Sequence, residues 1–395
     1  MATPEARHTG IDAVRGAVMV IMALDHVREF FNADAMLFQA EDLTRTTPGL
    51  FLTRWITHLC APGFVFLAGV AAQRRLARGG SVAALSRYLW TRGLWLIVLE
   101  LTVMRLAFNF RIGGQDPLLL IILVALGLSM VALAGLVHLP APVVGAIGAA
   151  VVVGHNLLDP IRPADFGALA PLWNLLHDPG VFVVAGLPVV FGYPALPWAG
   201  LMAVGFASGH LFDLEPERRR RLLTMTGLAL LAGFVALRTL NQYGDPSPWS
   251  AQASPVMTAL SFLRTTKYPP SLQFVLMTIG PLLLMLAWCD RRPPAPTHPL
   301  VAIGRVPLFF YVAHFYLAHI VASVVAAVQY GPELAFLSGP FPSMGGSRDL
   351  FPPGFGHPLW VTYVAWVGVV AAMYPLCRWY GRFKREHKPW WGSLL

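Results

Sequence analysis

The sequence has few charged residues and few cysteines, and both shortages narrow the class of protein. Only 12% of its 395 residues are Asp, Glu, Lys or Arg, about half of the roughly 25% that is typical of soluble domains. Hydrophobic residues make up 56%, and the mean hydropathy is +0.60. The three cysteines show no C-x-x-C spacing, so neither a disulfide scaffold nor a zinc site is expected. These values predict a protein that folds in a lipid bilayer.

Several functional signatures are also missing. The sequence has no G-x-S-x-G nucleophile elbow, no H-E-x-x-H zinc helix and no G-x-x-x-x-G-K-[ST] phosphate loop. We expect no bound metal. Asp12 and Arg15 interrupt the first apolar run, which we therefore interpret as a retained span rather than a cleaved signal peptide. The net charge of +9 comes largely from basic residues at the ends of apolar runs, so no nucleic-acid partner is expected.

Long apolar runs recur along the whole chain. At about 20 residues per membrane crossing, we predict an all-α integral membrane protein, a polytopic bundle of about ten or eleven transmembrane helices. The predicted spans are 10–31, 50–73, 86–108, 117–138, 141–157, 191–212, 221–240, 270–289, 299–328 and 357–380. A further apolar segment at 181–190 is too short to cross alone, and is either re-entrant or part of an eleventh span. Pro307 predicts a kink or strong tilt in the ninth span.

Basic clusters in the loops indicate the orientation. With ten spans, four clusters fall on one side of the membrane: Arg74, Arg75, Arg78 and Arg87; Arg218 to Arg221; Arg291 and Arg292; and Arg378, Arg382, Lys384, Arg385 and Lys388. Because basic loops stay in the cytoplasm, both termini are predicted to be cytoplasmic. Residues 1–395 form one predicted transmembrane domain with a short cytoplasmic tail at 381–395. The excess of Arg over Lys favours a bacterial protein, located in the cytoplasmic (inner) membrane.

Ionisable residues interrupt the predicted spans at two depths. A charge in hydrocarbon costs a few kcal/mol or more, so such residues usually face a wet or protein-lined cavity. Nearer the cytoplasmic side lie Asp12, Arg15, Arg92, His210 and Arg305. Farther out lie Asp25, His26, Arg28, Glu29, Arg54, His58, Glu100, Arg105, His314 and His319. In the first span, one helical stripe joins the two depths through Asp12, Arg15, Met19, Met22, His26 and Glu29.

This pattern predicts a tunnel with two chemically different ends. Arg15, Arg92 and Arg305 are candidates to bind an anionic donor, because guanidinium groups match phosphate geometry. A histidine of the outer group is a candidate general base, oriented by an acidic neighbour. Structural roles compete with this interpretation. Arginines near span ends can reach lipid headgroups, Asp12 and Arg15 can form a structural pair, and a single buried histidine is often only a helix contact.

Three motifs resemble one family of membrane enzymes. Ile11–Gly16 (IDAVRG) resembles the L-D-x-x-R-G opening of transmembrane acyltransferases related to heparan-α-glucosaminide N-acetyltransferase. Ala61–Gly69 (APGFVFLAG) is similar to that family's F-P-W-F-V-F-x-x-G motif, and Gly304–Tyr311 resembles its bacterial branch. The most specific part of the resemblance lies within residues 10–75.

The resemblance implies a bundle of about eleven helices that takes an acetyl group from cytoplasmic acetyl-CoA. It implies transfer to a sugar amine across the membrane, with Arg15 in the donor tunnel and a histidine near the outer mouth. In the family that histidine lies in the loop after the first span, whereas residues 32–49 contain none. His26 and His58 are then the candidate bases, His314 is a third, and Asp25 or Glu29 is the partner.

Two hypotheses from different classes follow. The first is an integral-membrane O- or N-acyltransferase that uses acetyl-CoA or another acyl-CoA and a sugar or small envelope acceptor. Its site would consist of His26, His58, Asp25, Glu29 and His314 for catalysis and Asp12, Arg15, Arg92 and Arg305 for the donor. A homodimer is possible, and loop histidines His155 and His177 are further candidates for acceptor binding. The alternative is a proton-coupled transporter in which Asp25, Glu100 and the histidines form a relay.

Overall fold

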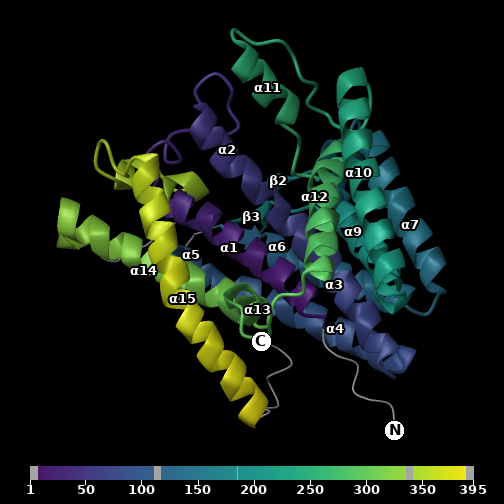
Figure 1. Cartoon of the computed structure of the whole chain (residues 1–395). Coiled ribbons are helices and arrows are strands. Elements are labelled where there is room, and N and C mark those ends of the chain that lie inside the picture. The colour runs from purple at the N-terminus through teal and green to yellow at the C-terminus, as the bar shows by residue number, and fades with distance from the viewer. Residues whose placement is uncertain (1–7, 111–116, 185, 335–340, 388–395) are drawn as a thin grey trace.

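The computed structural model describes residues 8–110, 117–184, 186–334 and 341–387. Nearly all of the regular structure is helical, as Figure 1 shows. The helices in the first half are α1 (Thr9–Phe31), α2 (Pro48–Ile56), α3 (Cys60–Ala77), α4 (Val82–Leu99), α5 (Arg105–Asn109), α6 (Ile122–Leu136), α7 (Ala141–Gly154) and α8 (Ala170–Leu176). Those in the second half are α9 (Ala195–Ser208), α10 (Pro216–Leu240), α11 (Pro255–Leu263), α12 (Leu272–Arg291), α13 (Pro299–Gly304), α14 (Pro307–Tyr330) and α15 (Leu359–His387).

Membrane-spanning helices dominate the fold. Among the described residues, seven helical segments are long and apolar enough to cross a bilayer: Pro48–Ala77, Ala141–Leu158, Ala195–Asp213, Pro216–Leu240, Leu272–Arg291, Pro307–Tyr330 and Leu359–His387. Helix α6 is apolar but shorter, with 15 residues. Helices α1 and α4–α5 match two further predicted spans but carry more charge. The predicted all-α polytopic membrane fold is confirmed, and its helices follow the ten predicted segments.

The short apolar segment at 181–190 is not a further helix. It contributes strands β2 (Gly180–Val184) and β3 (Leu187–Phe191), which pair in antiparallel fashion. Strand β1 (Leu118–Leu120) joins β3 in parallel register, with Leu119 opposite Val190. β-branched residues such as Val181, Val183, Val189 and Val190 favour this extended conformation. The possibility that this segment completes an eleventh transmembrane helix is therefore wrong.

Helix α1 lies at the centre of the bundle and packs against α3, α12, α13, α14 and α15 (Figure 1). Fourteen of its 23 residues are buried. A helix with this many ionisable residues is costly to expose to lipid, and its central position removes that cost. Its polar side chains therefore point at other protein elements or at the cavity described below.

Two opposite faces of the bundle can be distinguished. Ring contact between His8 and Phe212, at 5.4 Å between centroids, brings the start of α1 to the end of α9. Arg219 near the start of α10 binds Asp290 near the end of α12 at 2.7 Å. The predicted basic clusters 218–221 and 291–292 thus lie together, and we call this end the basic face. The long connections 32–47 and 241–271 lie at the other end, the loop face. Lys388 is outside the described residues.

A close backbone contact joins α1 to α13. A Cβ atom at Gly304 would lie 1.8 Å from the carbonyl oxygen of Asp12, and one at Gly16 would lie 1.9 Å from that of Leu300. The chain then breaks between α13 and α14, where Val306 is not helical (φ −130°, ψ 52°) and Pro307 begins α14. The predicted kink at Pro307 is therefore a complete break. Arg305 lies at this break, beside α1.

Replacing Gly304 with alanine is expected to destabilise the protein strongly. The added methyl group meets backbone rather than a flexible side chain, and overpacking of this kind costs about 1–3 kcal/mol. Thermal unfolding of the purified protein in detergent measures the effect. Gly368→Ala in α15 is the matched control, because no atom lies within 4 Å of the Cβ it adds. Equal melting temperatures for the two variants would contradict the packing described here.

Candidate active site

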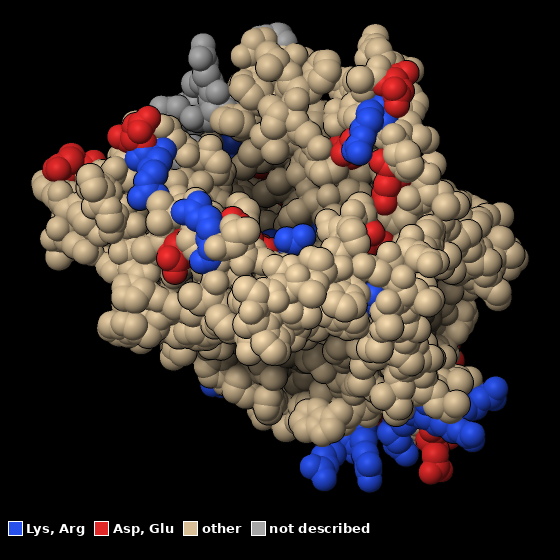
Figure 2. All heavy atoms as spheres, turned by 90° about the horizontal axis from the view of Figure 1, so that it is seen from above, with Lys and Arg blue, Asp and Glu red and all other residues tan. Residues whose placement is uncertain are grey.

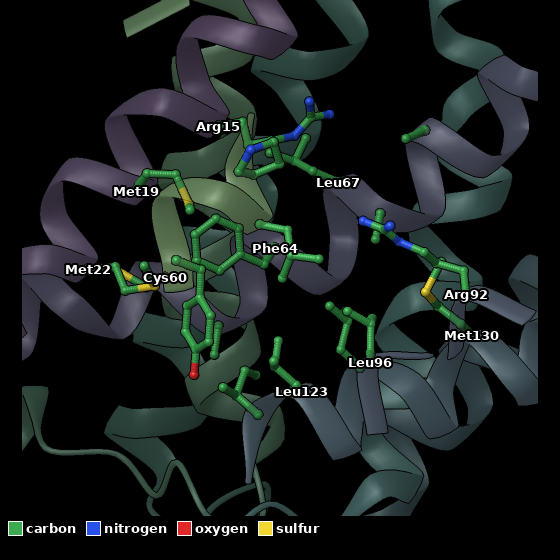
Figure 3. A pocket seen from close by; sticks show the side chains of 18 of the residues that line it. Arg15, Met19, Met22, Cys60, Phe64, Leu67, Arg92, Leu96, Leu123 and Met130 are labelled. Atoms are coloured by element: carbon green, nitrogen blue, oxygen red, sulfur yellow. The ribbon is translucent and has the colours of Figure 1, made fainter. Parts of the chain in front are cut away.

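A cavity of about 520 Å³ lies between α1, α3, α4, α6 and the start of α14. Its middle is apolar, and Figure 3 shows Met19, Met22, Phe64, Leu96 and Leu123 around it. One end is cationic and the other carries mixed polar groups. The loop face is also hollowed near its centre, with basic and acidic side chains in the hollow (Figure 2). The cavity therefore has the amphipathic character that small-molecule sites commonly show.

Four arginines line the cationic end: Arg15, Arg75, Arg78 and Arg92. Arg15 comes from α1 and Arg92 from α4, and they lie on opposite sides of the cavity (Figure 3). Arg75, at the end of α3, places its guanidinium 4.2 Å from the ring centre of Tyr88. Four guanidinium groups at one end of the cavity have the chemistry that favours anions, and phosphate oxygens in particular.

Asp12 and Arg305, two of the residues predicted to bind the donor, lie beside Arg15. Asp12 is buried and binds Arg15 Nη1 through Oδ1 at 3.3 Å, while its Oδ2 lies 3.5 Å from Arg305 Nε. Arg15 Nη1 also donates to the carbonyl oxygen of Gly304 at 3.1 Å. Arg305 donates to the carbonyl oxygen of Pro296 at 3.2 Å. Neither Asp12 nor Arg305 lines the cavity; Asp12 pairs directly with the Arg15 guanidinium, and Arg305 contacts Asp12.

The opposite end of the cavity contains Asp25, His26, Thr57, Tyr193, Lys267 and Tyr311. Along α1, His26 stands about 16 Å from Arg15 at 1.5 Å per residue. The helical stripe predicted in the first span thus runs along the cavity wall, because Arg15, Met19, Met22 and His26 all line it. Glu29, the last member of that stripe, does not reach the cavity and pairs with Arg28.

His26 forms a hydrogen-bonded pair with His314 of α14. The distance from His26 Nδ1 to His314 Nε2 is 2.8 Å, and His314 Nδ1 lies 2.7 Å from the carbonyl oxygen of Phe310. Since a carbonyl only accepts, the neutral His314 ring carries its proton on Nδ1 and accepts at Nε2. His26 must then donate from Nδ1. This assignment, inferred from the partners, leaves a lone pair on His26 Nε2 with no hydrogen-bond partner among the described residues.

Asp25 belongs to an ion-pair network at the loop face. It pairs with Arg28 at 3.3 Å and with Arg54 of α2. Arg54 Nε in turn donates to Glu41 Oε1 at 3.0 Å. Burial alone would raise the pKa of Glu41, but the Arg54 guanidinium and a hydrogen bond from His58 hold that pKa well below its usual range. The network therefore ties the 32–47 connection to α1 and α2.

His58 has a different environment from His26. Its Nε2 lies 3.2 Å from Glu41 Oε1, its ring packs 5.2 Å from that of Phe274, and only 1% of the residue is exposed. It does not line the cavity. The same is true of His314, which is completely buried and contacts the cavity only through His26. Of the three candidate histidines, His26 alone reaches the cavity.

Several cavity residues were not predicted from the sequence. Arg75 and Arg78 were interpreted only as topology signals. Lys267 and Tyr193 come from loops without periodicity, and they meet at the loop face: the Lys267 ammonium lies 5.9 Å from the Tyr193 ring and 5.2 Å from that of Tyr268. Lys267 is the only one of the three lysines outside the C-terminal end of the chain, which is the one sequence signal that marks it.

The comparison with known families agrees with this geometry. The family model described as heparan-alpha-glucosaminide N-acetyltransferase, catalytic, matches residues 7–243, more than half of the chain. The chain belongs to this family. No curated protein matches the sequence. The matched residues include α1, α3, α4 and α6, and hence most of the cavity wall, whereas Lys267 and Tyr311 lie beyond them.

Family membership confirms the predicted resemblance to heparan-α-glucosaminide N-acetyltransferases. It also establishes the chain as a transmembrane acyltransferase in a multi-pass membrane protein. The enzyme hypothesis is therefore preferred over the proton-coupled transporter. Of the residues that suggested a proton relay, Asp25 and His26 line the cavity, whereas Glu100 and His314 do not.

Proposed function

We propose that this acyltransferase moves an acetyl or other acyl group from an acyl-CoA at the basic face to an amine or hydroxyl acceptor at the loop face. The observation that carries the proposal is that His26, whose Nδ1 is paired with His314, lines the same cavity as Arg15 and Arg92. A cationic entrance, an apolar passage and a general base thus occur in one continuous space. The proposal includes a cytoplasmic basic face, as the charge pattern predicts, and a bacterial inner membrane, as the excess of Arg over Lys suggests.

The shape and charge of the cavity support an acyl-CoA donor. Its phosphates would bind Arg15, Arg75, Arg78 and Arg92, where charge-assisted hydrogen bonds are strongest. The uncharged arm would occupy the apolar middle, between Met19, Phe64 and Leu96. The roughly 16 Å between Arg15 and His26 along α1 would then separate the anionic part of the donor from its thioester.

In the proposed reaction His26 acts as a general base. Its Nε2 takes the proton from the acceptor amine or hydroxyl while that nucleophile attacks the thioester carbonyl carbon. The carbon–sulfur bond then breaks, and the leaving thiolate takes the proton from His26, which regenerates the neutral ring. His314 accepts the hydrogen bond from His26 Nδ1 throughout and is a positioning residue. Asp25 lies beside His26 and stabilises the transient imidazolium.

Acyl transfer from radiolabelled acetyl-CoA to a panel of amino sugars, including methyl α-glucosaminide, tests the proposal. The purified protein is expected to label at least one acceptor, and Cys60→Ala is expected to retain transfer within a few-fold. Cys60 lines the cavity, and its Sγ lies 3.5 Å from the carbonyl oxygen of Val18. Loss of transfer in Cys60→Ala, with labelled protein in the wild type, would contradict direct transfer and indicate an acyl-enzyme. No transfer from any acyl-CoA would overturn the proposed function.

A further inference from the structure

A second cluster of chemically reactive side chains lies at the loop face, outside the cavity. His155 follows α7, Asp159 lies four residues later, and His177 follows α8. One ligand atom from each of the three lies within 4.8 Å of the other two. Both histidines are about 2% exposed. None of the three lines the cavity, so the acyltransferase chemistry does not account for them.

The geometry points to a transition-metal site, and we propose that His155, Asp159 and His177 bind Zn²⁺. Two imidazoles and a carboxylate are a ligand set that Zn²⁺ uses, with metal–ligand distances of about 2.0–2.2 Å. In a tetrahedral site such ligand atoms stand about 3.3 Å apart. His177 Nε2 lies 3.6 Å from Asp159 Oδ1, close to that spacing. Mg²⁺ and Ca²⁺ prefer all-oxygen sites and fit this set poorly.

The hydrogen bonding of His155 supports the metal site independently of the ligand spacing. Although the residue is buried, neither of its ring nitrogens makes a hydrogen bond of ordinary geometry among the described residues. A buried imidazole without partners is costly, and a metal ion at one nitrogen removes that cost. The Pro270 backbone lies beside the ring, and metal-binding histidines commonly direct their second nitrogen to such a group.

The surrounding side chains are arranged as supports for metal ligands. Asn156 Nδ2 donates to Asp159 Oδ2 at 3.0 Å, which leaves Oδ1 for the metal. The Trp173 ring stacks on His177 at 5.2 Å and fixes its orientation. His177 Nε2 now contacts the carbonyl oxygen of His155 at 2.8 Å. With metal bound at Nε2, the proton of the neutral ring moves to Nδ1. Asp159 is partly exposed, so water completes the coordination.

The proposed metal would fasten the 156–180 connection to the core. Asn156 Oδ1 accepts from the backbone nitrogen of Leu272 at 3.0 Å, at the start of α12. The adjoining segment carries Lys267, which lines the cavity. The site is therefore structural, and it belongs to the scaffold from which the loop-face end of the cavity is built.

Measuring the zinc content of the purified protein tests this proposal, and the test does not depend on acyl-transfer activity. The purified full-length protein, incubated with ZnCl₂ and passed through a desalting column, is expected to retain about one equivalent of zinc by mass spectrometry. His155→Ala should bind zinc at least 100-fold more weakly in a chelator competition. His357→Ala, at another loop-face histidine, should bind like the wild type. CoCl₂ should give the intense visible absorption of tetrahedral cobalt in the wild type and lose it in His155→Ala.

If His155→Ala does not fold, Asp159→Asn replaces it as the test variant. Asparagine keeps the shape of the side chain and removes the charged ligand. It should weaken zinc binding at least tenfold while the protein remains monodisperse. Wild-type protein without stoichiometric zinc, or a His155→Ala/His177→Ala variant that retains the full equivalent, would overturn the proposal. Either result leaves the acyltransferase proposal standing.

Discussion

His26→Ala is expected to lower the turnover of acyl transfer by at least 100-fold, with little change in the KM for the donor. A general base contributes roughly 10²–10⁴-fold to rate, and His26 is the candidate histidine that lines the cavity. Arg15 lies about 16 Å away along α1, so donor binding at the cationic end should persist. Initial rates with radiolabelled acetyl-CoA at saturating acceptor provide the measurement.

The matched control for this variant is His58→Gln. His58 follows α2, contacts the acidic network through Glu41 at 3.2 Å, and does not line the cavity. Glutamine retains a donor toward Glu41, so turnover should fall less than tenfold. If His58→Gln abolishes transfer while His26→Ala remains active, the assignment of the base is wrong.

The double variant Arg15→Gln/Arg92→Gln, which removes two of the four cavity arginines, is expected to raise the KM for acyl-CoA by about 100-fold or more. Hydrogen bonds to charged groups contribute about 1.5–3 kcal/mol each, and both guanidiniums line the cationic end on opposite sides. Turnover at saturating donor should change only a few-fold, because neither residue is near His26. Steady-state kinetics at varied acetyl-CoA concentration separate the two parameters.

The dependence of the KM for acyl-CoA on ionic strength provides a second test of the same double variant. Salt screens phosphate–arginine attraction, so the KM of the wild type should rise with salt more steeply than that of the double variant. Arg45→Gln is the control, because Arg45 stacks on Phe38 in the 32–47 connection, away from the cavity. A double variant with unchanged KM and unchanged salt dependence would show that the donor binds elsewhere.

The membrane fold could be predicted from the sequence because lipid imposes long apolar helices. The predicted spans 141–157 and 221–240 correspond to α7 and α10, each of which contains a long apolar stretch. The secondary structure of segment 181–190 could not be predicted, because the sequence of a short apolar run is compatible with both a strand and a helix. The π-helical turn at Glu100–Met104 shifts the face of the third span, and no periodicity argument anticipates such a shift.

Residues of the candidate site that share one helix could be predicted together from the sequence, whereas contacts between helices could not. Helical spacing correctly placed Arg15 and His26 on one stripe of α1, because that relation is local. Whether His26 or His58 faces the cavity depends on the rotation of α1 against α3 and α14, which the sequence does not encode locally. Lys267 reaches the cavity from a long loop, and such long-range positions carry no spacing signal.

The account depends on one cavity that connects a donor at the basic face to an acceptor at the loop face. The most direct test is transfer in sealed vesicles of known protein orientation, with acetyl-CoA on one side of the membrane and methyl α-glucosaminide, or another acceptor found active with the purified protein, on the other. We expect labelled acceptor when acetyl-CoA is at the basic face and the acceptor is at the loop face. If product forms only when both substrates are on the same side of the membrane, transfer through a connecting cavity is contradicted.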